Sequence, residues 1–132
     1  MFTLFEVNQA ATFQGVAFLS CDPKRAFGSD RQEMTKGDSP TPKWEIQVVA
    51  MTRDQFGRPQ NEVLRVGVAS HTDPAKGLTP YTPVDMVRFQ VGVMEKTKRN
   101  PETGEEKIIG VQVWYRAEAI RALAAAPTGK AA

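Results

Sequence analysis

Basic and aromatic residues recur in the second half of the chain at spacings that suit a single-stranded nucleic acid. Arg65, Arg88 and Arg116 fall, by alternation, on the polar faces of three successive predicted strands, and Trp114 lies on the same face as Arg116. Single strands are bound by a basic groove together with aromatic rings on which bases stack. A tryptophan on the polar face of an amphipathic strand is unexpected unless something covers it. These four residues therefore predict a face that holds phosphates and stacks a base.

Two predicted hairpin tips add further candidates for the same role. One tip, between strands at 43–52 and 62–70, carries Arg53, Phe56 and Arg58. The tip between the last two predicted strands carries Lys96, Lys98 and Arg99. Basic hairpins that flank a barrel face are suited to clasp an extended polyanion, because phosphate contacts need positive charge and little else.

Enzymatic chemistry has much less support in the sequence. Ser70, His71 and Asp73 are nearly adjacent, so their side chains cannot all point at one another in a catalytic relay. Cys21 has no identifiable base and is interpreted as an apolar residue at a strand end. One cysteine and one histidine do not suffice for a structural zinc site. The sequence therefore predicts a non-enzymatic protein without a metal or cofactor.

Five stretches alternate apolar and polar residues with a period of two, which is typical of half-buried strands. They span residues 12–20, 43–52, 62–70, 83–95 and 108–116. Trp44 shares a face with Ile46 and Val48 and is expected in the core. The last two stretches predict a long antiparallel pair whose inward face carries Val87, Phe89, Val91, Val93, Ile109, Val111, Val113 and Tyr115.

The segments outside these strands are expected to differ in character. Phe2–Val7 predicts a short strand or a loose arm. The polar residues 21–42 predict a mobile loop, because they offer little to bury. The prolines of 71–83 leave no room for a useful helix. Residues 116–126 contain strong helix formers and predict a short C-terminal helix, followed by a disordered tail at 127–132.

Five strands with glycines inside them predict an all-β, OB-like small barrel with long hairpins and a short C-terminal helix. Closing the sheet removes the exposed edges that five flat strands would present. A five-stranded SH3-like barrel and an open α+β sheet are the alternatives. With 132 residues in the chain, residues 1–126 are expected to form a single domain.

Composition limits the classes of function. The chain has 17 lysines and arginines against 15 acidic residues, a formal net charge of +2. It is therefore no polycation, and a nucleic-acid binder of this kind must concentrate its positive charge locally. The N-terminus has neither the basic start nor the long apolar run of a signal peptide, and no stretch reaches the length of a membrane span. A single cysteine fits a reducing compartment, so a cytoplasmic location is expected.

Three stretches carry a resemblance to a known group of proteins: Gly15–Phe18, Lys43–Val48 and Tyr115–Ile120. Together they resemble the small regulatory or replication-activator-like proteins of actinobacterial conjugative and integrative elements. The layout is also similar to OB-fold domains that bind single-stranded DNA. Two departures from those domains are visible, since the Pro-rich segment 71–83 replaces the usual helix and a long acidic tail is absent.

The pattern and the resemblance together predict a single-stranded-DNA-binding OB-fold protein that supports replication or transfer of a plasmid or integrative element. The expected partners are single-stranded DNA and further copies of the chain, as a dimer or tetramer. The alternative is a homodimeric protein-interaction or transcription-regulatory module that does not bind nucleic acid directly. A basic, uncovered Trp114 face favours the first function, and a Trp114 buried in a symmetric interface favours the second.

Overall fold

The computed structural model describes residues 2–26 and 28–123, and its regular structure is mostly β, as predicted. Its elements, in chain order, are β1 (Phe2–Glu6), α1 (Gln9–Thr12), β2 (Gly15–Pro23), β3 (Lys43–Arg53), β4 (Pro59–Ala69), β5 (Val84–Val87), β6 (Gln90–Arg99), β7 (Glu106–Arg116) and β8 (Ala119–Ala122). β1 confirms the short strand that was one of two predictions for Phe2–Val7. The described residues thus form more than the five strands that the sequence predicts.

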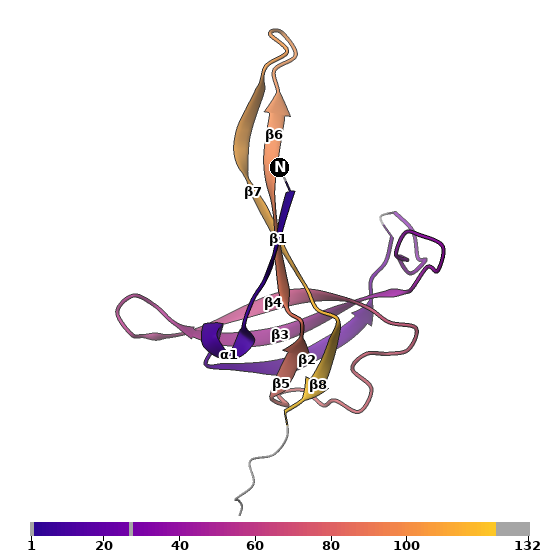
Figure 1. Cartoon of the computed structure of the whole chain (residues 1–132), viewed down its shortest axis with the longest axis vertical. Coiled ribbons are helices and arrows are strands. Elements are labelled where there is room, and N and C mark those ends of the chain that lie inside the picture. The colour runs from indigo at the N-terminus through magenta and orange to yellow at the C-terminus, as the bar shows by residue number, and fades with distance from the viewer. Residues whose placement is uncertain (1, 27, 124–132) are drawn as a thin grey trace, which may run out of the picture.

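A curled six-stranded sheet with the strand order β1-β6-β7-β4-β3-β2 forms the body of the molecule. Its neighbouring strands are antiparallel except β4 and β7, which run parallel and meet only at Val66–Tyr115 and Gly67–Arg116. Beyond that short contact, β6 and β7 leave the body together with β1 as a projecting arm (Figure 1). The parallel contact therefore marks the junction between the arm and the curled part of the sheet.

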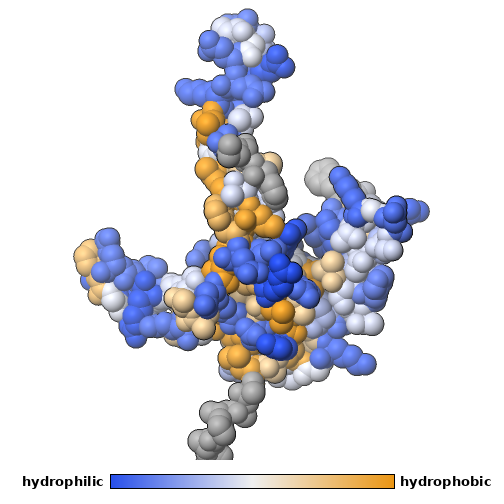
Figure 2. Space-filling model, viewed as in Figure 1, coloured by the Kyte–Doolittle hydropathy of each residue, from blue (hydrophilic) through white to orange (hydrophobic). Residues whose placement is uncertain are grey.

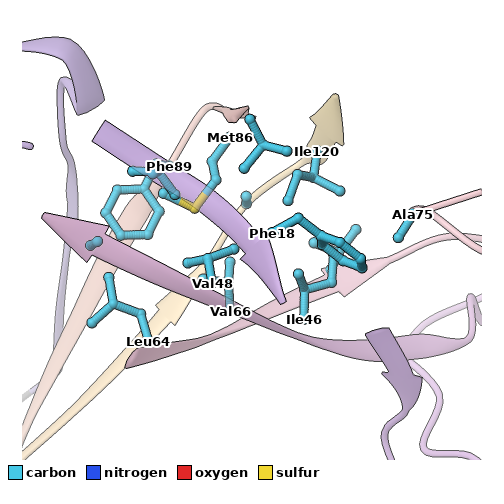
Figure 3. Close-up of a cluster of buried hydrophobic side chains, with 14 residues drawn as sticks. Phe18, Ile46, Val48, Leu64, Val66, Ala75, Met86, Phe89 and Ile120 are labelled. Atoms are coloured by element: carbon cyan, nitrogen blue, oxygen red, sulfur yellow. The ribbon is translucent and has the colours of Figure 1, made fainter. Parts of the chain in front are cut away.

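The core lies inside the curl of the sheet, where alternate residues of neighbouring strands meet (Figure 3). β3 and β4 follow the predicted alternation closely, because every second residue is buried along the central part of both strands. The buried hydrophobic residues include Val16, Phe18, Ile46, Val48, Ala50, Leu64, Val66, Val68, Val84, Met86, Phe89 and Ile120. This core fixes which residues of β3 and β4 face outward.

The predicted strand 83–95 is broken into β5 and β6 by a kink at Arg88. The backbone of Arg88 has φ of 51°, a left-handed conformation that is uncommon for a residue other than glycine. The kink shifts the alternation by one residue, so that Met86 and Phe89 are both buried while Val87 is only half-buried. The prediction that Val87 points inward with Phe89 is therefore wrong, although Phe89 itself is buried.

The predicted C-terminal helix is wrong over the residues that the structure describes. Residues 119–122 form β8, which pairs antiparallel with β5 and places Ile120 opposite Met86. Ile120 is 7% exposed in this arrangement, so its burial in the core outweighs the helix propensity of the surrounding alanines. Residues 124–126 and the tail predicted at 127–132 lie outside the described residues.

The short helix α1, which the pattern did not predict, attaches the N-terminal segment to β5. The Asn8 side chain caps α1 by accepting a hydrogen bond from the backbone of Ala11. Gln9 then donates to the carbonyl of Val84 at 2.9 Å and accepts from the amide of Met86 at 2.7 Å. These two bonds satisfy β5 backbone groups beside the kink.

The two long connections are only partly as predicted. Residues 71–83 are turns without a helix, as expected from their prolines. The predicted loop 21–42 starts later, because β2 continues to Pro23. The rest of that loop is held by isolated bridges between Arg25 and Gln32 and between Met34 and Pro42. Its mobility stays a prediction.

Candidate nucleic-acid interface

A groove of about 780 Å³ lies where the arm joins the curled sheet. Its lining comes from β3, β4, β6, β7 and the loop that follows β2. Arg88, just before β6 in the chain, and Ala117 and Glu118, just after β7, complete the lining. All four residues that the strand pattern singled out line this groove: Arg65, Arg88, Trp114 and Arg116. The fold therefore brings together side chains that are separated by up to 51 positions (116 − 65) along the chain.

Arg65 and Arg116 enter the groove because of the register between β4 and β7. Leu64 and Val66 are buried on the core face of β4, so Arg65 between them points outward. The parallel contact then sets Arg116 beside Gly67, two residues further along β4. Arg116 Nε donates to the neutral Oε1 atom of Gln90 at 2.7 Å, and no described carboxylate forms an ion pair with Arg116.

Arg88 reaches the groove through the kink between β5 and β6. Its Nε lies 3.2 Å from the Glu6 carboxylate, and its Nη1 lies 3.7 Å from the Glu118 carboxylate. Glu118 is positioned there because its backbone amide donates to the carbonyl of Val87 at 2.8 Å. All three side chains are more than 60% exposed, so each pair contributes little to stability.

Lys24 and Lys43 also line the groove, and the sequence analysis missed both. Their ammonium groups lie 3.3 and 3.7 Å from the same Glu33 oxygen. Burial alone would raise the pKa of Glu33, but the hydrogen bond and charge of Lys24, helped by Lys43, lower it overall. The bond from Lys24 N to the Lys43 carbonyl at 3.0 Å continues the pairing of β2 with β3, and the bond from Lys43 N to the Glu33 carbonyl at 2.8 Å brings Glu33 beside both lysines.

Trp114 lies across from Gly92 in the pairing of β7 with β6, and its indole ring rests against the Gly92 backbone. A Cβ atom added to Gly92 would come within 2.6 Å of the indole nitrogen, closer than real side chains approach. Only glycine therefore allows this ring position, in the way that aromatic residues cover glycines on neighbouring strands. Trp114 is half-buried and contributes to the lining of the groove.

Trp44 lies on the part of the lining that β3 provides. Its indole nitrogen donates to the carbonyl of Ser70 at 2.8 Å, which fixes the ring at the end of the strand. It shares the face of Ile46 and Val48 as predicted, but it is only half-buried and lines the groove. A second aromatic residue therefore contributes to the lining of the groove.

The charge of the groove is positive but locally compensated. Five cationic side chains line it, namely Lys24, Lys43, Arg65, Arg88 and Arg116, against the carboxylates of Glu45 and Glu118. Glu6 and Glu33 outside the lining also pair with three of these cations. Within the described residues Arg65 takes part in no ion pair. Arg65 and Arg116 are therefore the cations most available to an anionic ligand.

The two hairpin tips lie away from the groove lining. Arg53, Phe56 and Arg58 surround the turn between β3 and β4, where the Arg58 guanidinium lies 5.8 Å from the centre of the Phe56 ring. Lys96, Lys98 and Arg99 lie toward the tip of the arm. In Figure 1 the two tips project in different directions from the body. The residues predicted to form one interface therefore lie in three separate places: the groove, the turn between β3 and β4, and the part of the arm near its tip.

The residues considered for catalysis have structural roles where the structure describes them. Ser70 and Asp73 accept hydrogen bonds from the backbone amides of Thr72 and Ala75, as in ordinary turns. Desolvation by burial, with the charge and hydrogen bonding of Asp73, raises the pKa of Cys21 to about 12. No cluster of potential metal ligands occurs among residues 2–26 and 28–123.

Comparison with known proteins gives no relative from which to transfer a function. The chain matches no protein-family model, no curated protein and no solved structure. Across the described part of the chain, no helix is long and apolar enough to cross a membrane. The groove and its residues are therefore the basis for any functional proposal.

Proposed function

We propose that the protein binds single-stranded DNA in the groove between the arm and the curled sheet, without catalysing a reaction. The observation that carries this proposal is the gathering of Arg65, Arg88, Trp114 and Arg116 along one groove. Lys24, Lys43 and Trp44 line the same groove. Cations for phosphates and aromatic rings for bases are the two features that proteins use to bind single strands without strong sequence preference.

The geometry of the groove supports a specific arrangement of the ligand. Phosphates contact Arg65 and Arg116, because neither side chain must leave a carboxylate to do so. A base stacks on Trp114, whose ring is supported by the Gly92 backbone. Arg88 reaches a phosphate by exchanging the Glu6 or Glu118 carboxylate for it. Such a ligand contacts the base faces and backbone of one strand and not a duplex groove.

We also propose that the curled sheet has the architecture of an OB-like barrel. The five strands that the sequence predicted correspond to β2, β3, β4, β6 and β7, and the third and fifth of these are the parallel pair. An isolated bridge from Ala17 of β2 to Pro83 connects the edge strand β2 of the curled sheet to the segment just before β5. OB barrels bind oligonucleotides on the face of their second and third strands and with the loops after the first and fourth. The groove here is lined from the corresponding β3, β4, β7 and 24–42 segments.

The biological role we propose follows from the resemblance to replication-activator-like proteins of actinobacterial mobile elements. A protein that coats or presents single-stranded DNA supports replication or transfer of such an element. The basic tips of the arm and of the β3–β4 hairpin add contacts to a longer strand that leaves the groove. Contacts of this kind are electrostatic and independent of sequence.

Direct binding assays test the proposal. Fluorescence anisotropy is measured with the purified protein and labelled single-stranded DNA, duplex DNA and RNA of matched length, each at two salt concentrations. We expect the tightest binding to single-stranded DNA, weakening as salt rises because counterions are released. A Trp114→Ala variant serves as the site control, with its melting temperature measured alongside. Equal affinity of the folded variant, or no preference for a single strand, would contradict the proposal.

A further inference from the structure

The arm exposes more apolar surface than a free-standing β-hairpin should. Ile108, Ile109, Val111 and Val113 of β7 are 49–60% exposed, and Phe5 of β1 is 53% exposed. Figure 2 shows hydrophobic residues along the lower arm and hydrophilic ones at its tip. A contiguous exposed apolar patch often marks an interaction site.

β7 also has a long backbone edge without a neighbouring strand in the described structure. Its contact with β4 is limited to Tyr115 and Arg116, so the stretch from Glu106 to Val113 is paired only with β6. Such an edge is a template for pairing with another strand, and proteins usually protect it with prolines, charges, bulges or a covering element. β7 has one irregularity at Ile109, between the pairs Lys96–Gly110 and Thr97–Ile108 of the ladder with β6. From Ile108 to Val113 the edge carries apolar side chains at four of six positions and no charge.

The open stretch is self-complementary when two copies run antiparallel. Gly110 lies at its middle, and a Cβ atom there would meet nothing within 4 Å. A glycine inside a strand often marks a place where another backbone approaches closely. With Gly110 on the axis, Val111 of each copy lies across from Ile109 of the other, and Ile108 lies across from Gln112. Apolar cross-strand pairs of this kind stabilise a sheet.

From this edge and its apolar side chains we infer that the protein forms a homodimer in which two β7 strands pair antiparallel through residues 107–113, about Gly110. A second copy is the occupant that fits, because antiparallel pairing sets Val111 of each copy against Ile109 of the other and covers exposed apolar side chains of both arms. Pairing also removes the exposed edge that the monomer leaves open.

The dimer adds to the groove if the proposed nucleic-acid function is correct. In an antiparallel pair the tip of each arm extends past Val113 of the other copy, toward the base of that arm. The groove lies there, so Lys98 and Arg99 of one copy approach the groove of the second. The tip residues and the groove residues, separated within one chain, then lie along one path for the strand.

Sedimentation of the protein without nucleic acid tests the dimer independently of DNA binding. Measurements across about a hundredfold range of concentration are needed, because the dimer fraction depends on concentration. We expect the double variant Val111→Lys, Val113→Lys to raise the dimer dissociation constant at least about tenfold, since it places like charges across the interface. Phe5→Lys is the matched control, because it adds a charge at an equally exposed apolar position on the opposite edge of the arm. A monomer at all concentrations, or equal effects of both variants, would overturn the inference.

Disulfide trapping tests the antiparallel orientation. In a Cys21→Ser background, Gly110→Cys places two thiols near the proposed axis, and mild oxidation should give a covalent dimer. Thr103→Cys at the arm tip should remain monomeric, because antiparallel arms hold their tips apart. Efficient cross-linking of the tip variant together with none at position 110 would exclude this pairing. Circular dichroism of each variant verifies that it is folded.

Discussion

The indole of Trp114 rests on the backbone of Gly92 in the adjacent strand of the arm. Neither residue alone explains the site, because the ring position depends on the missing side chain at 92. A Cβ atom there would overlap the indole, so the ring would have to move. The stacking surface of the groove is therefore built by two strands together.

Gly92→Ala should consequently weaken binding of single-stranded DNA although it touches no ligand. We expect a loss that approaches the 1–3 kcal/mol typical of removing a base-stacking aromatic, because the ring leaves its position. Anisotropy titrations measure the affinity, and near-ultraviolet circular dichroism reports the displaced tryptophan. Gly15→Ala is the matched control, since a Cβ atom at Gly15 meets nothing within 4 Å. A displaced ring with parental affinity would show that Trp114 does not stack a base.

Phe89→Ala should strongly destabilise the fold. Phe89 is 1% exposed and packs against the rings of Tyr115 and Phe13 at centroid distances of 5.8 and 5.9 Å. Truncating a buried phenylalanine costs about 3–5 kcal/mol, from the reduced burial and the cavity left behind. Val63→Ala, at a 55% exposed position, should cost less than about 1 kcal/mol. Urea denaturation compares the two, and equal small losses would show that Phe89 lies outside the cooperative core.

The strands were predictable because their signal is local. Ile46, Val48, Leu64 and Val66 are buried as the period of two requires, and the same alternation placed Arg65 on the outer face. Parity also placed Trp114 and Arg116 in the groove, since β7 is regular where it meets β4. Patterns of this kind depend on the residue and its immediate neighbours.

The errors arose where distant parts of the chain decide the local structure. The kink at Arg88 is accompanied by bonds from Gln9 to β5 and by ion pairs to Glu6 and Glu118, which no local pattern reveals. The alanine-rich C-terminal segment favours a helix locally, yet pairing with β5 buries Ile120. Lys24 reaches the groove because β2 continues past its predicted end and pairs with β3 as far as Pro23. The sequence therefore predicted the strands and the faces of β3 and β4 well, but the inward face predicted for Ile109, Val111 and Val113 is wrong, because these residues are 49–60% exposed on the arm.

Cys21 should react slowly with alkylating reagents in the folded protein. Burial and the nearby Asp73 raise the pKa of its thiol from 9.0 to about 12. At pH 8 this lowers the thiolate fraction about a thousandfold. The greater nucleophilicity of a more basic thiolate offsets part of this loss, so we expect an alkylation rate roughly thirtyfold lower. Mass spectrometry follows iodoacetamide labelling, with the urea-unfolded chain as the control. Equal rates in the two states would contradict the raised pKa.

The same thiol should make the free energy of unfolding depend on pH in alkaline solution. Because the pKa is raised in the folded state, the unfolded chain loses the thiol proton first as pH increases. The contribution of Cys21 to stability is therefore constant below about pH 9 and declines as pH rises toward 12. Cys21→Ala should remove this decline and leave that of Tyr115, whose pKa burial also raises, which denaturation curves at several pH values would show.

Removing Arg65 should change the salt dependence of DNA binding more than removing Arg88. Arg65 takes part in no ion pair within the described structure, whereas Arg88 lies between the carboxylates of Glu6 and Glu118. For a single strand, each phosphate that the protein no longer neutralises lowers the slope of log affinity against log salt by about 0.7. We expect Arg65→Gln to show this full change and Arg88→Gln a smaller one, because Arg88 must exchange one anion for another.

Glu118→Gln gives a second test of the difference between Arg65 and Arg88. It removes one of the two carboxylates that pair with Arg88, and it removes a negative charge from the groove lining. The variant should bind single-stranded DNA more tightly than the parent, with a steeper salt dependence because Arg88 can then neutralise a phosphate. Glu62→Gln, outside the groove lining, is the matched control for the removal of one acidic charge. Two results together would show that the DNA does not follow this groove. The folded Arg65→Gln variant would bind DNA with the affinity and salt dependence of the parent, and Glu118→Gln and Glu62→Gln would change the affinity equally.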